Sequence, residues 1–176
     1  MISIMLDWHH IFDEAPDRVL KAGAALFRRE DPVRFIYIVR SGMIALERPI
    51  VDGSTLILHQ ATQGMALAEA SLFAETYHCD AVARELSVVA AMPRPTFLVA
   101  LRKSPDAALS LIEAHSKEIQ KQRARVEILR LRRVADRLDA WLNLYGEPAK
   151  GEWINVAQAI GVSQPALYRE LAKRRD

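Results

Sequence analysis

The sequence is poor in cysteine and has no long apolar run. Cys79 is its single cysteine, so no disulfide can form within the chain, and one chain cannot supply the four thiolates of a zinc or iron–sulfur site. No segment approaches the ~20 apolar residues of a membrane-spanning helix. Residues 1–6 are largely apolar but have no positive flank, and Asp7 follows at once, which differs from a secretory signal. We therefore expect a cytoplasmic protein that has no membrane partner.

The motifs of catalysis and metal binding are missing as well. We find no glycine-rich phosphate loop, no metal-binding spacing of His and Cys, and no set of a nucleophile and its base. The sequence therefore predicts a non-enzyme with no catalytic residue, no metal site and no identifiable cofactor.

Positive charge is concentrated in the C-terminal part of the chain. The net charge is only +2. Residues 1–105 have 11 basic and 12 acidic side chains, whereas residues 106–176 have 13 and 10. A basic C-terminal part behind a nearly neutral N-terminal part favours a polyanionic partner such as double-stranded DNA. A solvated helix face would give the same pattern, so charge alone leaves both interpretations open.

Short apolar segments alternate with turn signals over residues 19–101. The expected strands are rich in aromatic and β-branched residues and lie at residues 35–39, 43–46, 55–59 and 86–91. Gly42 marks a turn, and Asp52-Gly53 is a typical hairpin pair because both positions tolerate a positive φ. Several short strands at this spacing predict an antiparallel, jelly-roll-like β-roll. We expect a short helix at residues 13–20 before it.

A long helix is expected after the roll. Ser104 is a suitable N-cap, Pro105 suits the first turn, and no proline or glycine follows until residue 146. Six residues recur on this helix at spacings of three and four: Ile112, His115, Ile119, Gln122, Val126 and Leu129. Such a coiled-coil-like seam favours a parallel partner helix and therefore a homodimer. Packing of the same stripe on the roll of one chain is the alternative.

The C-terminal segment over residues 153–171 has the pattern of a helix-turn-helix. Ala157 is small at the point where two helices cross, and Gly161 can end the first helix with a positive φ. Ser163 is a suitable N-cap, and Pro165 suits the first turn of the second helix. The expected shared core consists of Val156, Ile160, Val162 and Leu167.

The second of these helices carries the side chains that we expect to contact DNA. They are Ser163, Gln164, Pro165, Tyr168, Arg169 and Lys173. The N-terminal residues of a recognition helix enter the major groove, where Gln can pair with adenine and Arg with guanine. Glu170 departs from the pattern, because an apolar residue is usual there, and we expect Leu171 to take its place. A helical hairpin that only packs is the alternative.

With the roll, the long helix and the helix-turn-helix in this order, the chain resembles the CRP/FNR family of bacterial transcription regulators. The resemblance covers nearly the whole chain and rests on Gly23, Leu26, Phe27, Asp31, residues 37–39, Gly42, residues 67–73, residues 81–83, Arg137, Leu138, Trp141 and Leu142. It implies an α+β fold with a sensor roll at residues 1–103, a dimerisation helix at 104–144 and a DNA-binding domain at 145–176. Family members bind pseudo-palindromic operators as dimers, and RNA polymerase is a further expected partner.

The resemblance also places an effector pocket in the roll. Its expected residues are Glu69, Ala70, Ser71, Cys79, Asp80, Gln122 and Arg123. In members that bind cyclic nucleotides, a Glu, matched by Glu69, bonds the ribose, and an Arg-Ser pair holds the cyclic phosphate. Cys79 and Asp80 occupy the Arg-Ser positions, and like charges ~4 Å apart cost about 4 kcal/mol at an effective dielectric near 20. We therefore expect that the roll does not bind cyclic AMP or cyclic GMP in the usual way, and its effector stays unidentified.

His78, Cys79 and Asp80 form an unusual triplet, since one branch of the family holds haem through Cys and His in this region. Adjacent residues on a strand point to opposite faces, which argues against one metal ligated by both. We favour a buried structural cysteine. A haem or metal ligand and a redox-reactive thiol are the alternatives.

Two further departures concern the backbone. Glu30 replaces the glycine that usually precedes Asp31, which predicts a less strained turn. The chain stops at Asp176, just past the expected recognition helix, so we expect the family's β-wing to be missing.

The sequence as a whole predicts a DNA-binding regulator that acts as a homodimer. A regulatory or interaction dimer that has lost DNA binding is the alternative, which Glu170 and the missing wing favour.

Overall fold

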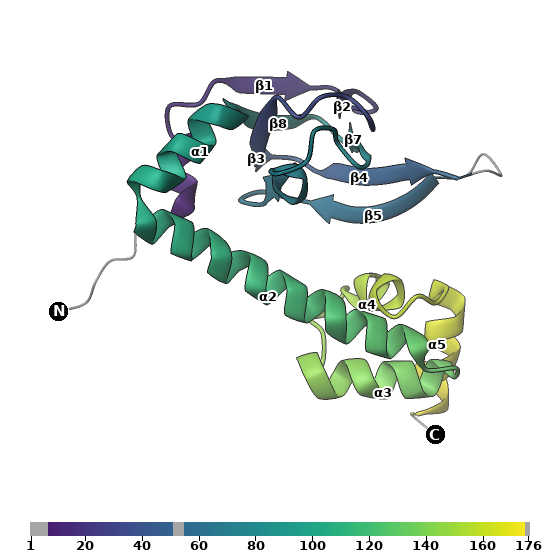
Figure 1. Ribbon diagram of the computed structural model, residues 1–176. Helices are drawn as coiled ribbons and strands as arrows, with labels where there is room; N and C mark the ends of the chain where they lie inside the picture. The colour runs from purple at the N-terminus through teal and green to yellow at the C-terminus, as the bar shows by residue number, and fades with distance from the viewer. Residues whose placement is uncertain (1–6, 51–54, 175–176) are drawn as a thin grey trace. The chain divides into compact units, whose positions relative to one another are not determined.

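A computed structural model describes residues 7–50 and 55–174 (Figure 1). The chain divides into two compact units, the first ending at Ile112 and the second beginning at Glu113. The boundary falls within one helix, α2 (Pro105–Arg130). The first unit contains the strands, and the second is helical.

The first unit is built on two four-stranded antiparallel sheets. Its strands are β1 (Asp17–Leu20), β2 (Ala25–Phe27), β3 (Phe35–Ser41), β4 (Ile44–Pro49), β5 (Thr55–Ala61), β6 (Ala66–Leu67), β7 (Asp80–Ala83) and β8 (Ser87–Pro93). One sheet has the order β1-β8-β3-β6, and the other has the order β2-β7-β4-β5. Together with the helices, this arrangement confirms the α+β class and the antiparallel roll.

The centre of the first sheet is buried on both faces. Four successive residues of β3, Ile36 to Val39, are each at most 3% exposed, whereas a strand with one solvated face would alternate. Helix α1 (Arg94–Lys103) and the 3₁₀-helix η1 (Trp8–Phe12) pack beside β8. Their Phe12 and Phe97 rings lie 5.5 Å apart between centroids. The two short helices therefore close the apolar core of the roll.

The expected strands are confirmed, with bounds that differ from the predicted ones by at most three residues, but the expected helix at residues 13–20 is wrong. Residues 17–20 instead form β1, with Asp17 paired to Ala90 of β8. Val19 is 69% exposed, because β1 is the edge strand and has one solvated face. The Asp52-Gly53 pair lies outside the described residues, although Pro49 and Thr55 on either side of it are paired.

Gly42 and Glu30 are among the turn positions that adopt the left-handed conformation. Gly42 has φ +82°, and a Cβ there would lie 2.6 Å from the carbonyl oxygen of Leu86, so the position requires glycine. Glu30 has φ +71°. The expectation of a less strained turn at Glu30 is therefore wrong: the chain keeps the conformation that suits glycine and places a residue with a Cβ in it.

The second unit consists of the C-terminal part of α2 with α3 (Val134–Tyr145), α4 (Trp153–Ala159) and α5 (Gln164–Lys173). Its buried core contains Ile128, Leu138, Val156, Ala157, Ile160 and Leu167. A single unbroken helix to Leu144 was expected, and in this respect the prediction is wrong. Helix α2 ends at Arg130 and α3 begins at Val134, because Ile128 and Leu138 are buried in one core that an unbroken helix could not close.

The Arg137 side chain stabilises the break between α2 and α3. Its guanidinium donates to the carbonyl oxygens of Leu129 (3.1 Å) and Leu131 (2.8 Å) at the end of α2. It also donates to those of Ile160 (3.1 Å) and Gly161 (3.2 Å) at the end of α4. Helix ends leave carbonyl groups without partners, so one side chain satisfies the ends of two helices.

We expect Glu30→Gly to stabilise the protein by about 0.5–1 kcal/mol, because glycine removes the strain of the left-handed conformation at some cost in chain entropy. Urea unfolding measures the change. Glu30→Ala is the matched control, since it removes the carboxylate but keeps the Cβ. Equal stability of the Gly and Ala variants would show that the left-handed conformation at Glu30 does not strain the backbone.

We expect Arg137→Met to destabilise the second unit by about 2–4 kcal/mol, because several half-buried carbonyl oxygens lose a charged donor. Arg133→Met is the control, because the Arg133 ion pair with Asp136 is largely exposed and should contribute at most about 1 kcal/mol. Thermal unfolding followed by circular dichroism compares the two. Similar losses in both variants would disprove the role of Arg137.

Candidate DNA-binding helices and effector site

Helices α4 and α5 lie where the two helices of a helix-turn-helix were expected. Gly161 has φ +66° between them, and a Cβ there would lie 2.6 Å from Cδ2 of Leu129. Ser163 is the N-cap of α5, and its hydroxyl oxygen accepts a hydrogen bond from the backbone N–H of Ala166 at 3.4 Å. Pro165 lies in the first turn. The turn and the cap are confirmed at the predicted positions. Of the predicted core residues, Val156, Ile160 and Leu167 are buried, and Val162 is partly buried against them.

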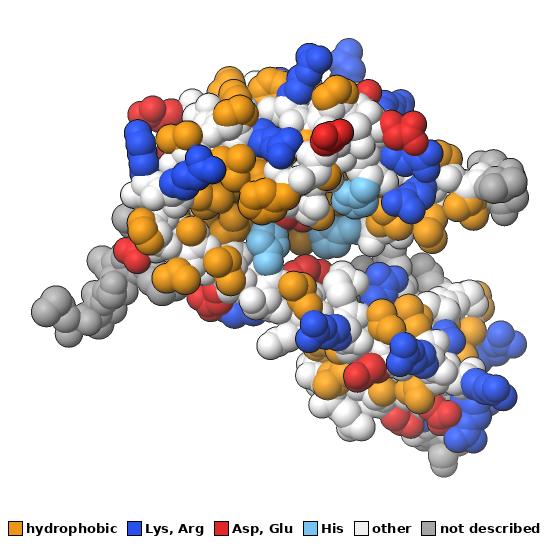
Figure 2. Space-filling view, in the orientation of Figure 1, with side chains coloured by type: hydrophobic (Ala, Val, Ile, Leu, Met, Phe, Trp, Pro, Cys, Tyr) orange, Lys and Arg blue, Asp and Glu red, His pale blue; other side chains and the backbone are white. Residues whose placement is uncertain are grey.

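All six residues expected to contact DNA are exposed on the start and one face of α5. These exposed residues are Ser163, Gln164, Pro165, Tyr168, Arg169 and Lys173. Leu167, on the opposite face, is fully buried. Figure 2 shows Lys and Arg side chains gathered at the edge of the second unit where α5 lies. The arrangement presents donors, acceptors and positive charge to solvent from one rigid helix.

Glu170 is accommodated by a residue that the sequence interpretation missed. Nε of Arg174 lies 3.5 Å from the Glu170 carboxylate, and Nη1 of Arg174 lies 2.7 Å from that of Asp139 on α3. These contacts raise the pKa of Arg174, and the hydrogen bond to Asp139 contributes most. Leu171 packs against the core, as expected. The acidic residue therefore joins α5 to α3 through Arg174 instead of disrupting the motif.

Helix α2 has an exposed apolar stripe at the predicted seam. Ile112, Ile119 and Val126 recur every seven residues and are 50–59% exposed, and Leu129 is 37% exposed. His115 also belongs to the seam, and burial lowers the pKa of its imidazole, although Glu118 opposes the shift. The spacing of seven matches one face of a coiled-coil helix.

In the roll, Glu69, Ala70 and Ser71 form a short 3₁₀-helix, η2 (Glu69–Ser71). Ala68 precedes it in the left-handed conformation, with φ +70°. Ser71 is buried, and its hydroxyl shares a hydrogen bond of 2.9 Å with Nδ1 of His78. The resemblance did not indicate this pair, which joins the two segments expected to form the pocket.

Cys79 and His78 lie on opposite sides of the chain, as expected for neighbours in an extended segment. Cys79 is 1% exposed, whereas His78 is exposed. Burial raises the pKa of the Cys79 thiol to about 11; Arg48 lowers it, and Asp80 and Glu69 raise it further. The thiol is therefore protonated at neutral pH, which favours the structural interpretation over the reactive one.

Asp80 is held by the β2–β3 turn. Its carboxylate accepts hydrogen bonds from the backbone N–H of Arg29 at 2.7 Å and from Nη1 of Arg28 at 3.1 Å.

Arg48 on β4 is a further charged residue near Cys79 that the sequence analysis did not identify. Its Nη2 donates to the carbonyl oxygen of His78 at 2.8 Å, and its positive charge acts on the Cys79 thiol.

Gln122 and Arg123 belong to the second unit, where both are exposed on α2. Gln122 donates to the Glu118 carboxylate on the preceding turn at 2.8 Å. Their assignment to the effector pocket stays a prediction.

Within residues 7–50 and 55–174, no group of three or more His, Cys, Asp or Glu side chains is arranged to hold a metal ion. Over the same residues, no helix combines the length and apolar character that a membrane crossing requires.

Curated proteins with a related sequence are much longer than this chain. The neuropathy target esterase sws of Drosophila melanogaster is 32% identical over 102 residues, which make up 53% of this chain and 7% of the esterase. The corresponding protein of Drosophila virilis is 33% identical over the same lengths. The chain thus spans less than a tenth of the length of these relatives, and the similarity is confined to one domain of them.

Solved structures share the fold over most of the chain. FixK2 from Bradyrhizobium japonicum has a TM-score of 0.66 at 15% identity and covers 90% of this chain and 83% of its own. The catabolite activator protein of Thermus thermophilus has a TM-score of 0.56 at 21% identity, with coverages of 93% and 80%. These structures confirm the expected CRP/FNR-type fold. Residues 17–104, half of the sequence, match the family described as the cyclic nucleotide-binding domain, and the chain belongs to this family.

Proposed function

We propose that the protein is a cytoplasmic, DNA-binding transcription regulator of the CRP/FNR type that acts as a homodimer. The observation that carries the proposal is the exposure of the expected DNA-contacting side chains on α5. Its six expected DNA contacts are exposed together, while Leu167 and Leu171 hold the opposite face on the core. A capped helix of ten residues with Gln164 at its start and Arg169 near its middle fits the major groove. RNA polymerase is a further predicted partner.

The proposed dimer rests on the stripe of α2. Large apolar residues rarely line one whole face of a solvated helix, and 26 residues give the helix nearly four heptads. A second copy would bury Ile119 and Val126 against their own counterparts. Two recognition helices on a symmetric dimer would then read the two halves of a pseudo-palindromic site.

We propose that the roll responds to an effector other than cyclic AMP, even though the domain belongs to the family of cyclic nucleotide-binding domains. The positions expected to hold the phosphate carry the protonated Cys79 thiol and the Asp80 carboxylate. Arg48 supplies one positive charge near Cys79, but it already donates to the His78 carbonyl, and Glu69 and Asp80 both act on the same thiol with negative charge. The local balance disfavours a cyclic phosphate.

DNA binding is tested by fluorescence anisotropy with a labelled duplex. We expect binding to weaken about 100-fold between 50 and 200 mM salt if four phosphates are contacted. Lys173→Ala should weaken binding to every duplex and reduce the salt slope by about one. On a duplex chosen by in vitro selection, Arg169→Ala should cost about 1–3 kcal/mol and relax one base position.

Lys103→Ala, on the exposed surface of the first unit, is the control for that titration and should bind as the native protein does. Absent or salt-insensitive binding would contradict the proposal and favour the alternative, a regulatory or interaction dimer that has lost DNA binding. Equal effects of Arg169→Ala on selected and scrambled DNA would show that Arg169 does not read a base.

Dimerisation is tested by sedimentation equilibrium. We expect the native protein at twice its 19.8 kDa chain mass, and Ile119→Glu at the mass of one chain, because two buried carboxylates would face each other across the seam. Leu144→Glu is the control, since Leu144 is 57% exposed on α3 and lies outside the stripe. A native protein that sediments as a monomer would exclude the dimer.

The sensor proposal is tested by calorimetry with cyclic AMP. We expect no binding tighter than about 100 μM in the native protein. The double variant Cys79→Arg with Asp80→Ser should bind at least tenfold more tightly, a gain of about 1.4 kcal/mol, because a guanidinium replaces the thiol and a hydroxyl replaces the carboxylate beside the phosphate. Micromolar affinity in the native protein would overturn this part of the proposal.

A further inference from the structure

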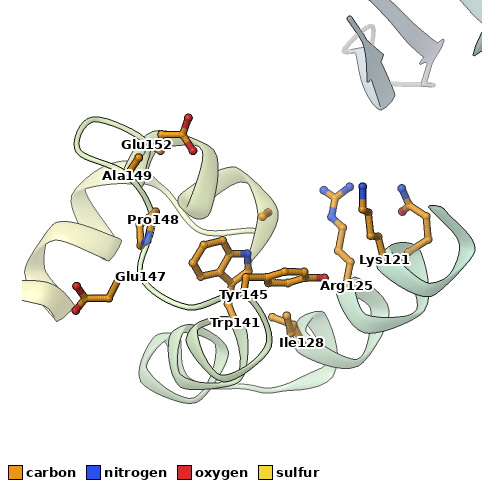
Figure 3. A pocket seen from close by; sticks show the side chains of 11 residues that line it. Lys121, Arg125, Ile128, Trp141, Tyr145, Glu147, Pro148, Ala149 and Glu152 are labelled. Carbon is orange, nitrogen blue, oxygen red and sulfur yellow. The ribbon is translucent and has the colours of Figure 1, made fainter. Parts of the chain in front are cut away.

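The second unit contains a pocket of about 520 Å³ between α2, α3 and the α3–α4 connection (Figure 3). It is lined by Lys121, Gln122, Arg125, Ile128, Trp141, Tyr145, Glu147, Pro148, Ala149, Glu152 and Ala159. Its volume is within the range of small-molecule sites, which are mostly apolar and have a few polar groups that orient the ligand. The proposed DNA-binding face of α5 contributes none of these residues.

One wall of the pocket is aromatic. Trp141 and Tyr145 are four residues apart on α3 and therefore lie on the same helix face. Their ring centroids are 5.3 Å apart, and the rings are inclined by 43°. Trp141 is half-buried, whereas Tyr145 is 47% exposed. The pair offers a surface on which a flat ring can pack.

The facing wall is cationic. Lys121 and Arg125 are four residues apart on α2 and rise side by side toward the pocket (Figure 3). Lys121 lies 3.9 Å from the Glu118 carboxylate. Nε of Arg125 is buried, and neither a hydrogen bond to it nor an ion pair with Arg125 occurs within the described residues. A buried donor without an acceptor is unfavourable, so an anion at this position would satisfy it.

Acidic residues of the pocket are on the other side of the aromatic pair. Glu147 and Glu152 belong to the connection and the start of α4. In Figure 3 the Glu147 side chain points away from Trp141, and the Tyr145 hydroxyl points toward Arg125. A ligand that packs on Trp141 and Tyr145 therefore meets positive charge at its α2 end.

We propose that this pocket binds a small aromatic carboxylate. The ring packs against Trp141 and Tyr145, and the carboxylate accepts hydrogen bonds from the Arg125 guanidinium, including its buried Nε. A guanidinium matches the two oxygens of a carboxylate in a fixed, bidentate geometry. Lys121 adds a second positive charge at the rim. All the residues that line this site belong to the second unit, and the proposal does not depend on DNA binding.

The experiment is isothermal titration calorimetry of the full chain with 2-naphthoate as the probe. Acetate and 2-naphthalenemethanol are the matched probes, because one has the carboxylate without the ring and the other has the ring without the charge. We expect 2-naphthoate to bind at least tenfold more tightly than either. Arg125→Gln should weaken it at least tenfold, whereas Arg130→Gln, at an exposed position on the same helix outside the pocket, should leave it unchanged.

Tyr145→Leu is the second variant, because its half-exposed ring can be removed with little loss of packing, and it should weaken 2-naphthoate severalfold. Circular dichroism establishes that each variant keeps its helices. No binding of 2-naphthoate to the native protein would overturn the proposal, as would equal affinity for the alcohol. Full affinity in both Arg125→Gln and Tyr145→Leu would also overturn it.

Discussion

The geometry of the helix-turn-helix depends on Arg137. Its guanidinium joins the last carbonyl groups of α2 to those of α4, so the break between α2 and α3 and the turn before α5 are fixed by one side chain. Leu138, its neighbour, is fully buried in the same core. The turn that leads into α5 is thus held by hydrogen bonds to backbone atoms, whose geometry depends little on which side chains surround them.

The parts of the fold that could be predicted from sequence are those set by local chemistry. Gly161 permits a positive φ, Ser163 caps a helix through its hydroxyl and Pro165 restricts its own φ, and the structure has all three where they were expected. The break after Arg130 could not be predicted, because no proline or glycine marks it. It arises from Ile128 packing into a core with residues far along the chain, and a helical pattern carries no information about such packing.

The assignment of the sensor site stays a prediction, but the structure shows contacts around it that the sequence did not indicate. The resemblance named Glu69 and Cys79 from separate segments, and in the structure the negative charge of Glu69 acts on the buried Cys79 thiol. It could not indicate Arg48, because the charge comes from β4, a different strand of the same sheet. Glu30 shows the opposite error: its chemistry argued against a left-handed turn, yet the fold imposes one.

The buried thiol has a practical consequence for spectroscopy. Cys79 is the chain's one native cysteine, and its sulfur is enclosed and protonated at neutral pH. Maleimide and spin-label reagents attack accessible thiolates, so a cysteine introduced at an exposed position such as Tyr168 would take up the label alone. Orientation and distance measurements on α5 could then be made in a background that keeps its natural core.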